Sequence, residues 1–91
     1  ILTFKTFDEV IERANNNDLG LCSYLYTNSM EQAHIGSEKL ESGTVAVNTG
    51  VVAVAEAPFG GIKQTGYGRE GGSGAIKDYL NVKYTHMGLK I

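Results

Sequence analysis

Residues 57–71 read APFGGIKQTGYGREG, and this stretch decides how the rest of the chain is interpreted. Residues 66–71, GYGREG, match the Gly-x-Gly-x-x-Gly pattern that cradles a pyrophosphate in dinucleotide-binding folds. That role requires a strand just before the pattern, a helix opening after it, and an acidic residue about 20 positions further on. Here the pattern follows a loop, and the residue 20 positions past Gly71 is Ile91. The glycines are therefore interpreted as a turn that needs positive φ angles and close packing.

The composition indicates a globular domain. The 91 residues are 42% hydrophobic and 20% charged, with one proline. A net charge of −2 without a basic run argues against a nucleic-acid partner, and no apolar run or signal peptide points to a membrane. The single cysteine fits a reducing, cytoplasmic setting. A chain this short buries only about 60–65% of its unfolded surface, so we expect marginal stability unless another surface covers its apolar faces.

The first 48 residues alternate between strand and helix patterns. Thr6 and Glu9 form a capping box that opens the first helix, and Gly43 is expected to end the second helix as a left-handed C′ residue. This alternation predicts an α/β fold with a parallel βαβαβ unit and right-handed crossovers. The predicted strands are residues 1–4, 21–27 and 44–48, and the predicted helices are residues 6–16 and 29–42.

The order changes after residue 48. Residues 49–70 form a long loop with two glycine pairs, and a loop of this length in a compact domain usually has a function. A short helix at 73–80 and a last strand at 82–88 are predicted to follow. Because the chain begins with Ile1 inside a strand pattern, we expect it to be a piece of a larger protein.

Isolated reactive residues do not indicate a site. Cys22 shares one face of a predicted strand with Tyr24 and Tyr26, which favours a small core residue over a nucleophile. His34 and His86 have no second ligand at metal-binding spacing, so no metal site is predicted.

Several motifs in register resemble the NAD(P)-dependent aldehyde dehydrogenases. Residues 57–71 resemble the PFGGxKxSGxGRE signature near the C-terminus of that family. Ala14-Asn15 with Gly20-Leu21 is similar to its AN…YGL turn, although Leu19 stands where tyrosine is usual. LESGTVAVN at 40–48 resembles LxxGxVxxN, and DYLNVKY at 78–84 resembles the last strand. Within the family, NTG at 48–50 and YLNVKYTHMGL at 79–89 are most similar to succinate-semialdehyde dehydrogenases.

The resemblance implies a domain organisation. Residues 1–81 would be the C-terminal part of the catalytic domain, and residues 82–91 an oligomerisation strand and tail. Residues 82–88 would join a neighbouring subunit's sheet in a homo-oligomer. NAD or NADP would bind an N-terminal Rossmann-like domain that the chain lacks, so none is expected to bind here. The family's cysteine nucleophile and glutamate base would precede Ile1, and Cys22 matches neither, so no catalytic residue is assigned and the chain alone is expected to be inactive.

The resemblance also implies substrate contacts. The parent enzyme would oxidise an aldehyde, expected to be succinate semialdehyde, to the carboxylic acid. Residues 49–57 would line the substrate tunnel, with Val51 and Ala53 as substrate-binding residues. Phe59 would either place its aromatic ring beside the aldehyde or pack within the loop, and the sequence is consistent with both roles. Members that take succinate semialdehyde often place a serine at the position of Ala53, which offers no donor to a carboxylate.

Two explanations fit this departure at Ala53. An arginine elsewhere in the enzyme could hold the carboxylate, or the true substrate could be less polar. The alternative to an enzyme is a non-enzymatic oligomerisation or binding module built from the same unit.

Overall fold

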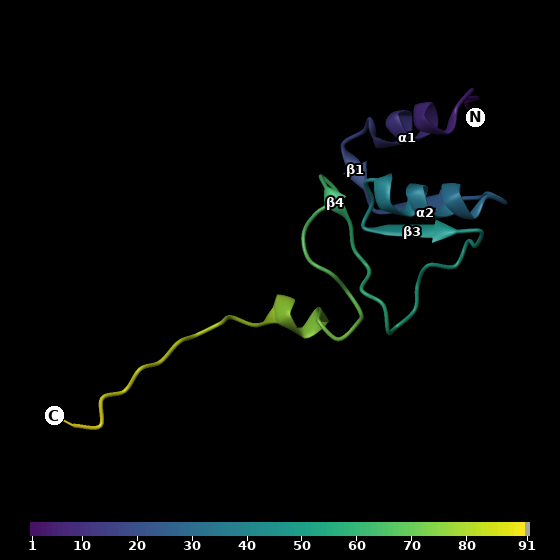
Figure 1. The fold of residues 1–91 in the computed structure, drawn as a ribbon. Helices are drawn as coiled ribbons and strands as arrows, with labels where there is room; N and C mark the ends of the chain where they lie inside the picture. The colour runs from purple at the N-terminus through teal and green to yellow at the C-terminus, as the bar shows by residue number, and fades with distance from the viewer. Residues whose placement is uncertain (91) are drawn as a thin grey trace.

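The structure is a computed structural model, and it describes residues 1–90. A small α/β body is followed by a C-terminal tail that extends away from it (Figure 1). The elements in chain order are α1 (Phe7–Asn15), β1 (Leu19–Gly20), β2 (Cys22–Leu25), α2 (Met30–Lys39), β3 (Thr44–Val47), β4 (Ile62–Lys63) and the 3₁₀ helix η1 (Ala75–Tyr79).

The centre of the body is a β–α–β unit. β2 and β3 pair in parallel, with Cys22 opposite Thr44 and Leu25 opposite Val47, and α2 connects them. Gly36 of α2 is buried, and its lack of a side chain leaves room for Leu25 of β2 and Phe7 of α1. α2 therefore packs between α1 and the β2–β3 pair (Figure 1). This part confirms the predicted strand–helix–strand order of residues 21–48.

The predicted three-stranded parallel sheet was wrong in its first strand. Residues 1–4 have no strand hydrogen bonding, and the Thr3 carbonyl instead accepts a bond of 2.8 Å from the Arg13 side chain. Residues 82–88 likewise form no strand within residues 1–90. Both segments have strand-like composition, but a strand also needs a neighbour to accept its backbone hydrogen bonds. The structure adds one pairing that was not predicted, an antiparallel contact between β1 and β4.

The helix ends follow the sequence in part. Thr6 caps α1 by accepting from the Glu9 amide, as predicted, but the Glu9 carboxylate reaches one residue further back, to the Lys5 amide at 2.8 Å. This backbone hydrogen bond, together with Arg13, lowers the pKa of Glu9. α2 ends at Lys39 rather than at residue 42.

Gly43 does not have the left-handed conformation predicted for it. It is needed for a different reason, because a Cβ at this position would overlap the carbonyl group of Gly60. The predicted role as a helix C′ residue was therefore wrong, and the glycine is required by tertiary contact between two backbones.

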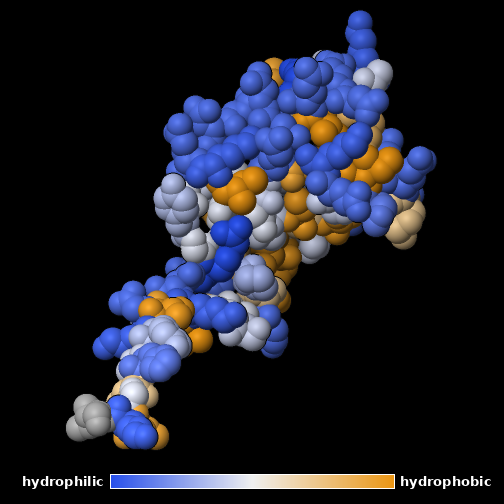
Figure 2. Space-filling model, turned by 60° about the vertical axis from the view of Figure 1, so that its left-hand side comes forward, coloured by the Kyte–Doolittle hydropathy of each residue, from blue (hydrophilic) through white to orange (hydrophobic). Residues whose placement is uncertain are grey.

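The buried core is small for a chain of this length. Ile11 and Ala46 are the buried apolar residues of the described chain, while large side chains such as Tyr26 and Val82 are exposed. Figure 2 shows hydrophobic patches on the visible face of the body and along the tail. The radius of gyration is 19.0 Å, compared with about 12 Å for a compact chain of this size. Across residues 1–90, no helix is long and apolar enough to cross a membrane.

Replacing Gly43 tests the backbone contact with Gly60. We expect Gly43→Ala to lower the free energy of unfolding by about 1–3 kcal/mol, because the added methyl group forces the two segments apart. Gly50→Ala is the matched control, since a Cβ at Gly50 would meet only the Tyr26 hydroxyl at 3.9 Å. Urea unfolding followed by circular dichroism measures both. Equal stability of the two variants would contradict the prediction.

Candidate functional site

The loop that contains residues 57–71 is closed on itself at its base. Phe59 and Glu70 form an antiparallel bridge in which each amide donates to the other carbonyl at 2.7 Å. Between them, β4 pairs with β1, so that Ile62 lies opposite Gly20 and Lys63 opposite Leu19. Residues 59–70, called the signature loop below, therefore form a closed loop that is attached to the body at β1.

Lys63 anchors this loop to α1. Its ammonium group donates to the carbonyls of Asn15 at 2.9 Å and Asn17 at 3.2 Å, and it forms an ion pair with Glu41. The C-terminal end of a helix carries unpaired carbonyls and a partial negative charge, which a cation stabilises. Lys63 also has a positive φ of 55°, which is unusual for a residue with a side chain. Sequence reasoning missed this anchor because the loop gives no periodic signal.

The glycines after β4 have the geometry predicted for them. Gly66, Gly68, Gly71 and Gly72 have φ angles of 126°, 81°, 67° and 67°. A side chain at Gly71 would meet the Ala57 carbonyl oxygen at 2.9 Å. These observations confirm the positive φ angles predicted for GYGREG and the close packing at Gly68 and Gly71, whereas a side chain at Gly66 would meet nothing within 4 Å.

Arg69 and Asp78 stabilise the glycine turn by hydrogen bonds to its backbone. The Arg69 guanidinium donates to the carbonyls of Gly61 at 2.9 Å and Gly68 at 2.8 Å. The Asp78 carboxylate on η1 accepts from the Arg69 amide at 2.8 Å. η1 is therefore tied to the signature loop rather than to the β2–β3 sheet.

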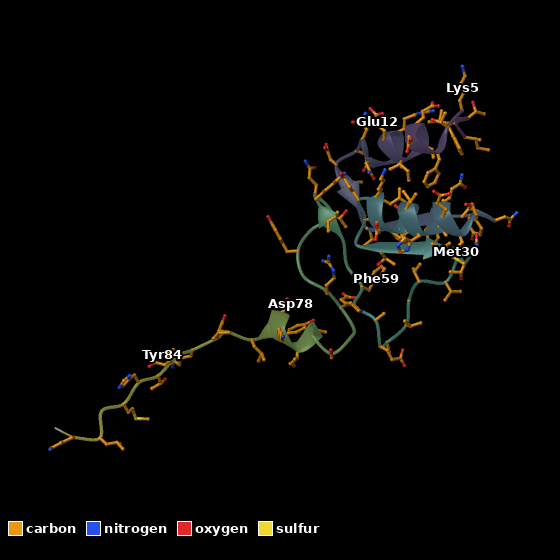
Figure 3. All side chains as sticks on the ribbon, in the orientation of Figure 1. Lys5, Glu12, Met30, Phe59, Asp78 and Tyr84 are labelled. Atoms are coloured by element: carbon orange, nitrogen blue, oxygen red, sulfur yellow. The ribbon has the colours of Figure 1, made fainter. Side chains whose placement is uncertain are left out.

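Phe59 lies on the walls of two open pockets. One lies between Leu21 and η1, where Asp78 and Tyr79 complete it, and Figure 3 shows the positions of Phe59 and Asp78. The other has a volume of about 300 Å³ and is lined by Ala53, Val54, Ala55, Ala57, Phe59, Glu70 and Gly71. The structure thus brings together two of the three predicted substrate residues, Ala53 and Phe59. Val51 is 72% exposed and does not line this pocket.

The remaining candidates stay apart. Cys22 is half-buried in β2, and its interaction with Tyr24 raises the pKa of the Tyr24 hydroxyl. His34 lies 3.6 Å from Glu38 on an exposed helix face, and His86 lies 3.1 Å from the Tyr84 hydroxyl in the tail. Within residues 1–90, no three His, Cys, Asp or Glu residues are grouped so that they could hold a metal ion.

Comparison with known proteins identifies the family. The model of the aldehyde dehydrogenase family matches residues 1–85. The chain is 47% identical over 88 residues to 3-sulfolactaldehyde dehydrogenase of Pseudomonas putida, and 46% identical over 88 residues to succinate semialdehyde dehydrogenase of Acinetobacter baylyi. Each match covers 97% of this chain and 18% of the relative.

A solved structure agrees with these relatives. The NAD+ complex of an aldehyde dehydrogenase from Bacillus cereus has a TM-score of 0.88 and 44% identity, covering 98% of this chain and 18% of that one. The chain therefore belongs to the aldehyde dehydrogenase family. Its relatives include succinate-semialdehyde dehydrogenases, which confirms the resemblance found in the sequence.

Proposed function

We propose that this chain is the C-terminal portion of an oxidoreductase that oxidises an aldehyde to a carboxylic acid with NAD or NADP. The main support is the family match over residues 1–85, which includes the whole signature loop. The chain spans about 18% of the length of the two curated relatives named above. The cysteine nucleophile and glutamate base would then belong to the part of the enzyme outside this chain.

The described residues do not fit NAD or NADP. The Gly-x-Gly-x-x-Gly turn is the one candidate cradle, but the carbonyl oxygens of Ala55 and Ala57 face Gly71. The Gly72 amide already donates to Ala55 at 2.9 Å. Carbonyl oxygens repel a phosphate, which needs free N–H groups instead. We therefore assign the cofactor to another part of the enzyme and expect none to bind this chain.

The loop after β3 would contribute the apolar wall of the substrate site. Ala53 and Phe59 line one pocket, and we assign Val51 to the same surface as a third contact in the assembled enzyme. The relatives' names specify sulfolactaldehyde and succinate semialdehyde, two aldehydes that carry an anionic group. Glu70 also lines the pocket, and its carboxylate would repel such a group. A cationic residue elsewhere in the enzyme would therefore hold the anionic group, with the carbon chain of the aldehyde against Phe59 and its anionic end within reach of position 53.

Residues 82–88 would join the enzyme into a homo-oligomer. The tail extends away from the body, and its side chains Val82, Tyr84 and Met87 are largely exposed. An extended apolar segment with unpaired backbone groups can add to the edge of another subunit's sheet.

The first test is an activity assay of the full-length enzyme and of the 91-residue chain. The full-length enzyme should reduce NAD+ or NADP+ when an aldehyde is added, and the chain alone should not. Absorbance at the wavelength of the reduced nicotinamide follows the reaction. Activity of the isolated chain would contradict the assignment of the nucleophile elsewhere. If neither protein reacted while the chain bound a protein partner, the binding-module alternative would replace the enzyme.

Replacing Ala53 tests the substrate contact. We expect Ala53→Ser in the full-length enzyme to lower KM for succinate semialdehyde about tenfold, because the added hydroxyl can donate to the carboxylate. Butanal is the matched neutral substrate, and its KM should change less than about twofold. Ala75→Ser on η1 serves as a control variant outside the pocket. Equal effects of Ala53→Ser on both aldehydes would exclude a contact with the anionic group.

Removal of the tail tests the proposed oligomer. We expect the full-length enzyme to be oligomeric in sizing experiments with light scattering, and a variant that ends after residue 81 to shift toward the monomer. The unpaired strand positions are lost with the tail, which removes the interface. A monomeric wild-type enzyme at high concentration, or an unchanged mass after truncation, would count against this role.

A further inference from the structure

The chain leaves β3 through an unusual residue, Asn48. Its φ is 55°, one of two positive φ angles among the non-glycine residues of the described chain. Its side chain makes a pair of hydrogen bonds with the backbone of Thr27, just beyond β2. The Thr27 amide donates to Asn48 Oδ1, and Asn48 Nδ2 donates to the Thr27 carbonyl, both at 2.9 Å.

These bonds replace one step of the parallel ladder. The Asn48 amide donates to the Leu25 carbonyl at 2.8 Å, as it would if the strand continued. In a regular parallel ladder the Thr27 amide would then bond the Asn48 backbone carbonyl. Here the side-chain oxygen accepts that bond instead. The backbone of Asn48 is therefore free to turn away from the sheet while the hydrogen bonding of β2 is completed.

Thr27 is itself fixed to the first turn of α2. Its hydroxyl accepts from the Ser29 amide at 3.0 Å and donates to the Gln32 side chain at 2.8 Å. Ser29 caps α2 by accepting from the Gln32 amide at 3.2 Å. The turn at Asn48 is thus connected by hydrogen bonds through Thr27 to the capped first turn of α2.

The chemistry of this position favours asparagine. The side chain must accept one hydrogen bond and donate another over a short reach, and the residue must tolerate a left-handed φ. Aspartate supplies no donor when ionised, and glycine tolerates the φ but supplies neither bond. Immediately after the turn, the Thr49 hydroxyl accepts from the Val51 amide at 3.1 Å, so the loop begins in a defined direction.

We infer that Asn48 is a positioning residue for the substrate loop, residues 49–57. By replacing a ladder bond with its side chain, it sets the direction in which this loop leaves the sheet and hence where Ala53 stands. The inference rests on the proposed function in assigning the loop to substrate. Asn48 itself does not touch the pocket that Ala53 and Phe59 line.

The test uses Asn48→Gly in the full-length enzyme, because glycine tolerates the left-handed turn and removes the side-chain bonds. We expect KM for the aldehyde to rise about tenfold, with kcat and KM for the cofactor changed less than about twofold. Asn48→Ala, which also disfavours the left-handed φ, should raise KM further. Asn28→Gly is the matched control, since Asn28 is exposed and its side chain makes no hydrogen bond within residues 1–90.

Hydrogen exchange measured by mass spectrometry gives a second readout that does not depend on activity. In Asn48→Gly, peptides from residues 49–57 should exchange about tenfold faster, while peptides from α2 stay at the wild-type rate. Equal KM and equal exchange in wild type and variant would overturn the inference. Faster exchange in both the loop and α2 would also overturn it, because that result indicates general destabilisation. If the wild-type enzyme oxidised no aldehyde, the proposed function would fail and the exchange comparison alone would decide the positioning role.

Discussion

The structure depends on a point where several backbones approach too closely for side chains. Gly43 lies against the Gly60 carbonyl, and its amide donates to Gly20 at 3.0 Å. A side chain at Gly20 would meet the Glu41 carbonyl oxygen at 2.6 Å, and one at Gly61 would meet the Gly20 carbonyl oxygen at 3.1 Å. Three segments that are distant in sequence can meet here only because each supplies glycine.

This contact gives a physical reason for the motifs recognised in the sequence. The Gly20-Leu21 turn, the LxxGxV passage with Gly43 and the PFGG stretch with Gly60 and Gly61 look unrelated along the chain. In the structure they form one junction, which Lys63 reinforces by bonding the end of α1 and Glu41. The motifs therefore specify how the signature loop packs against the body. This packing places Phe59 beside the two pockets that it lines.

The sequence predicted those parts of the fold that have local causes. The start of α1 follows from the capping box at Thr6, the β2–α2–β3 order follows from the alternating strand and helix patterns, and the glycine turn follows from the pattern at residues 66–71. The strand at residues 1–4 was overpredicted, because propensity does not reveal whether a partner strand is present. The β1–β4 pair has two residues per strand, too few for any periodic signal.

The candidate site was predictable to a smaller extent. Resemblance to the family singled out Ala53 and Phe59, and the structure brings them to one pocket. The motifs PFGGxKxSGxGRE and LxxGxVxxN include Lys63 and Asn48, but they did not indicate what these residues do, because each acts through an unusual backbone angle combined with side-chain bonds to distant carbonyls.

The loop proposed to contact substrate, residues 49–57, is fixed at both ends by hydrogen bonds. Asn48 ties the loop's beginning to Thr27, and the bridge between Phe59 and Glu70 fixes its end. Neither set of bonds uses the side chains of residues 50–57, so these positions can change without loss of the anchors. Relatives named for sulfolactaldehyde and for succinate semialdehyde are equally similar to this chain, at 47% and 46% identity. Overall identity is therefore similar for relatives named for different aldehydes, and under the proposed function the side chains between the two anchors would account for a difference in substrate.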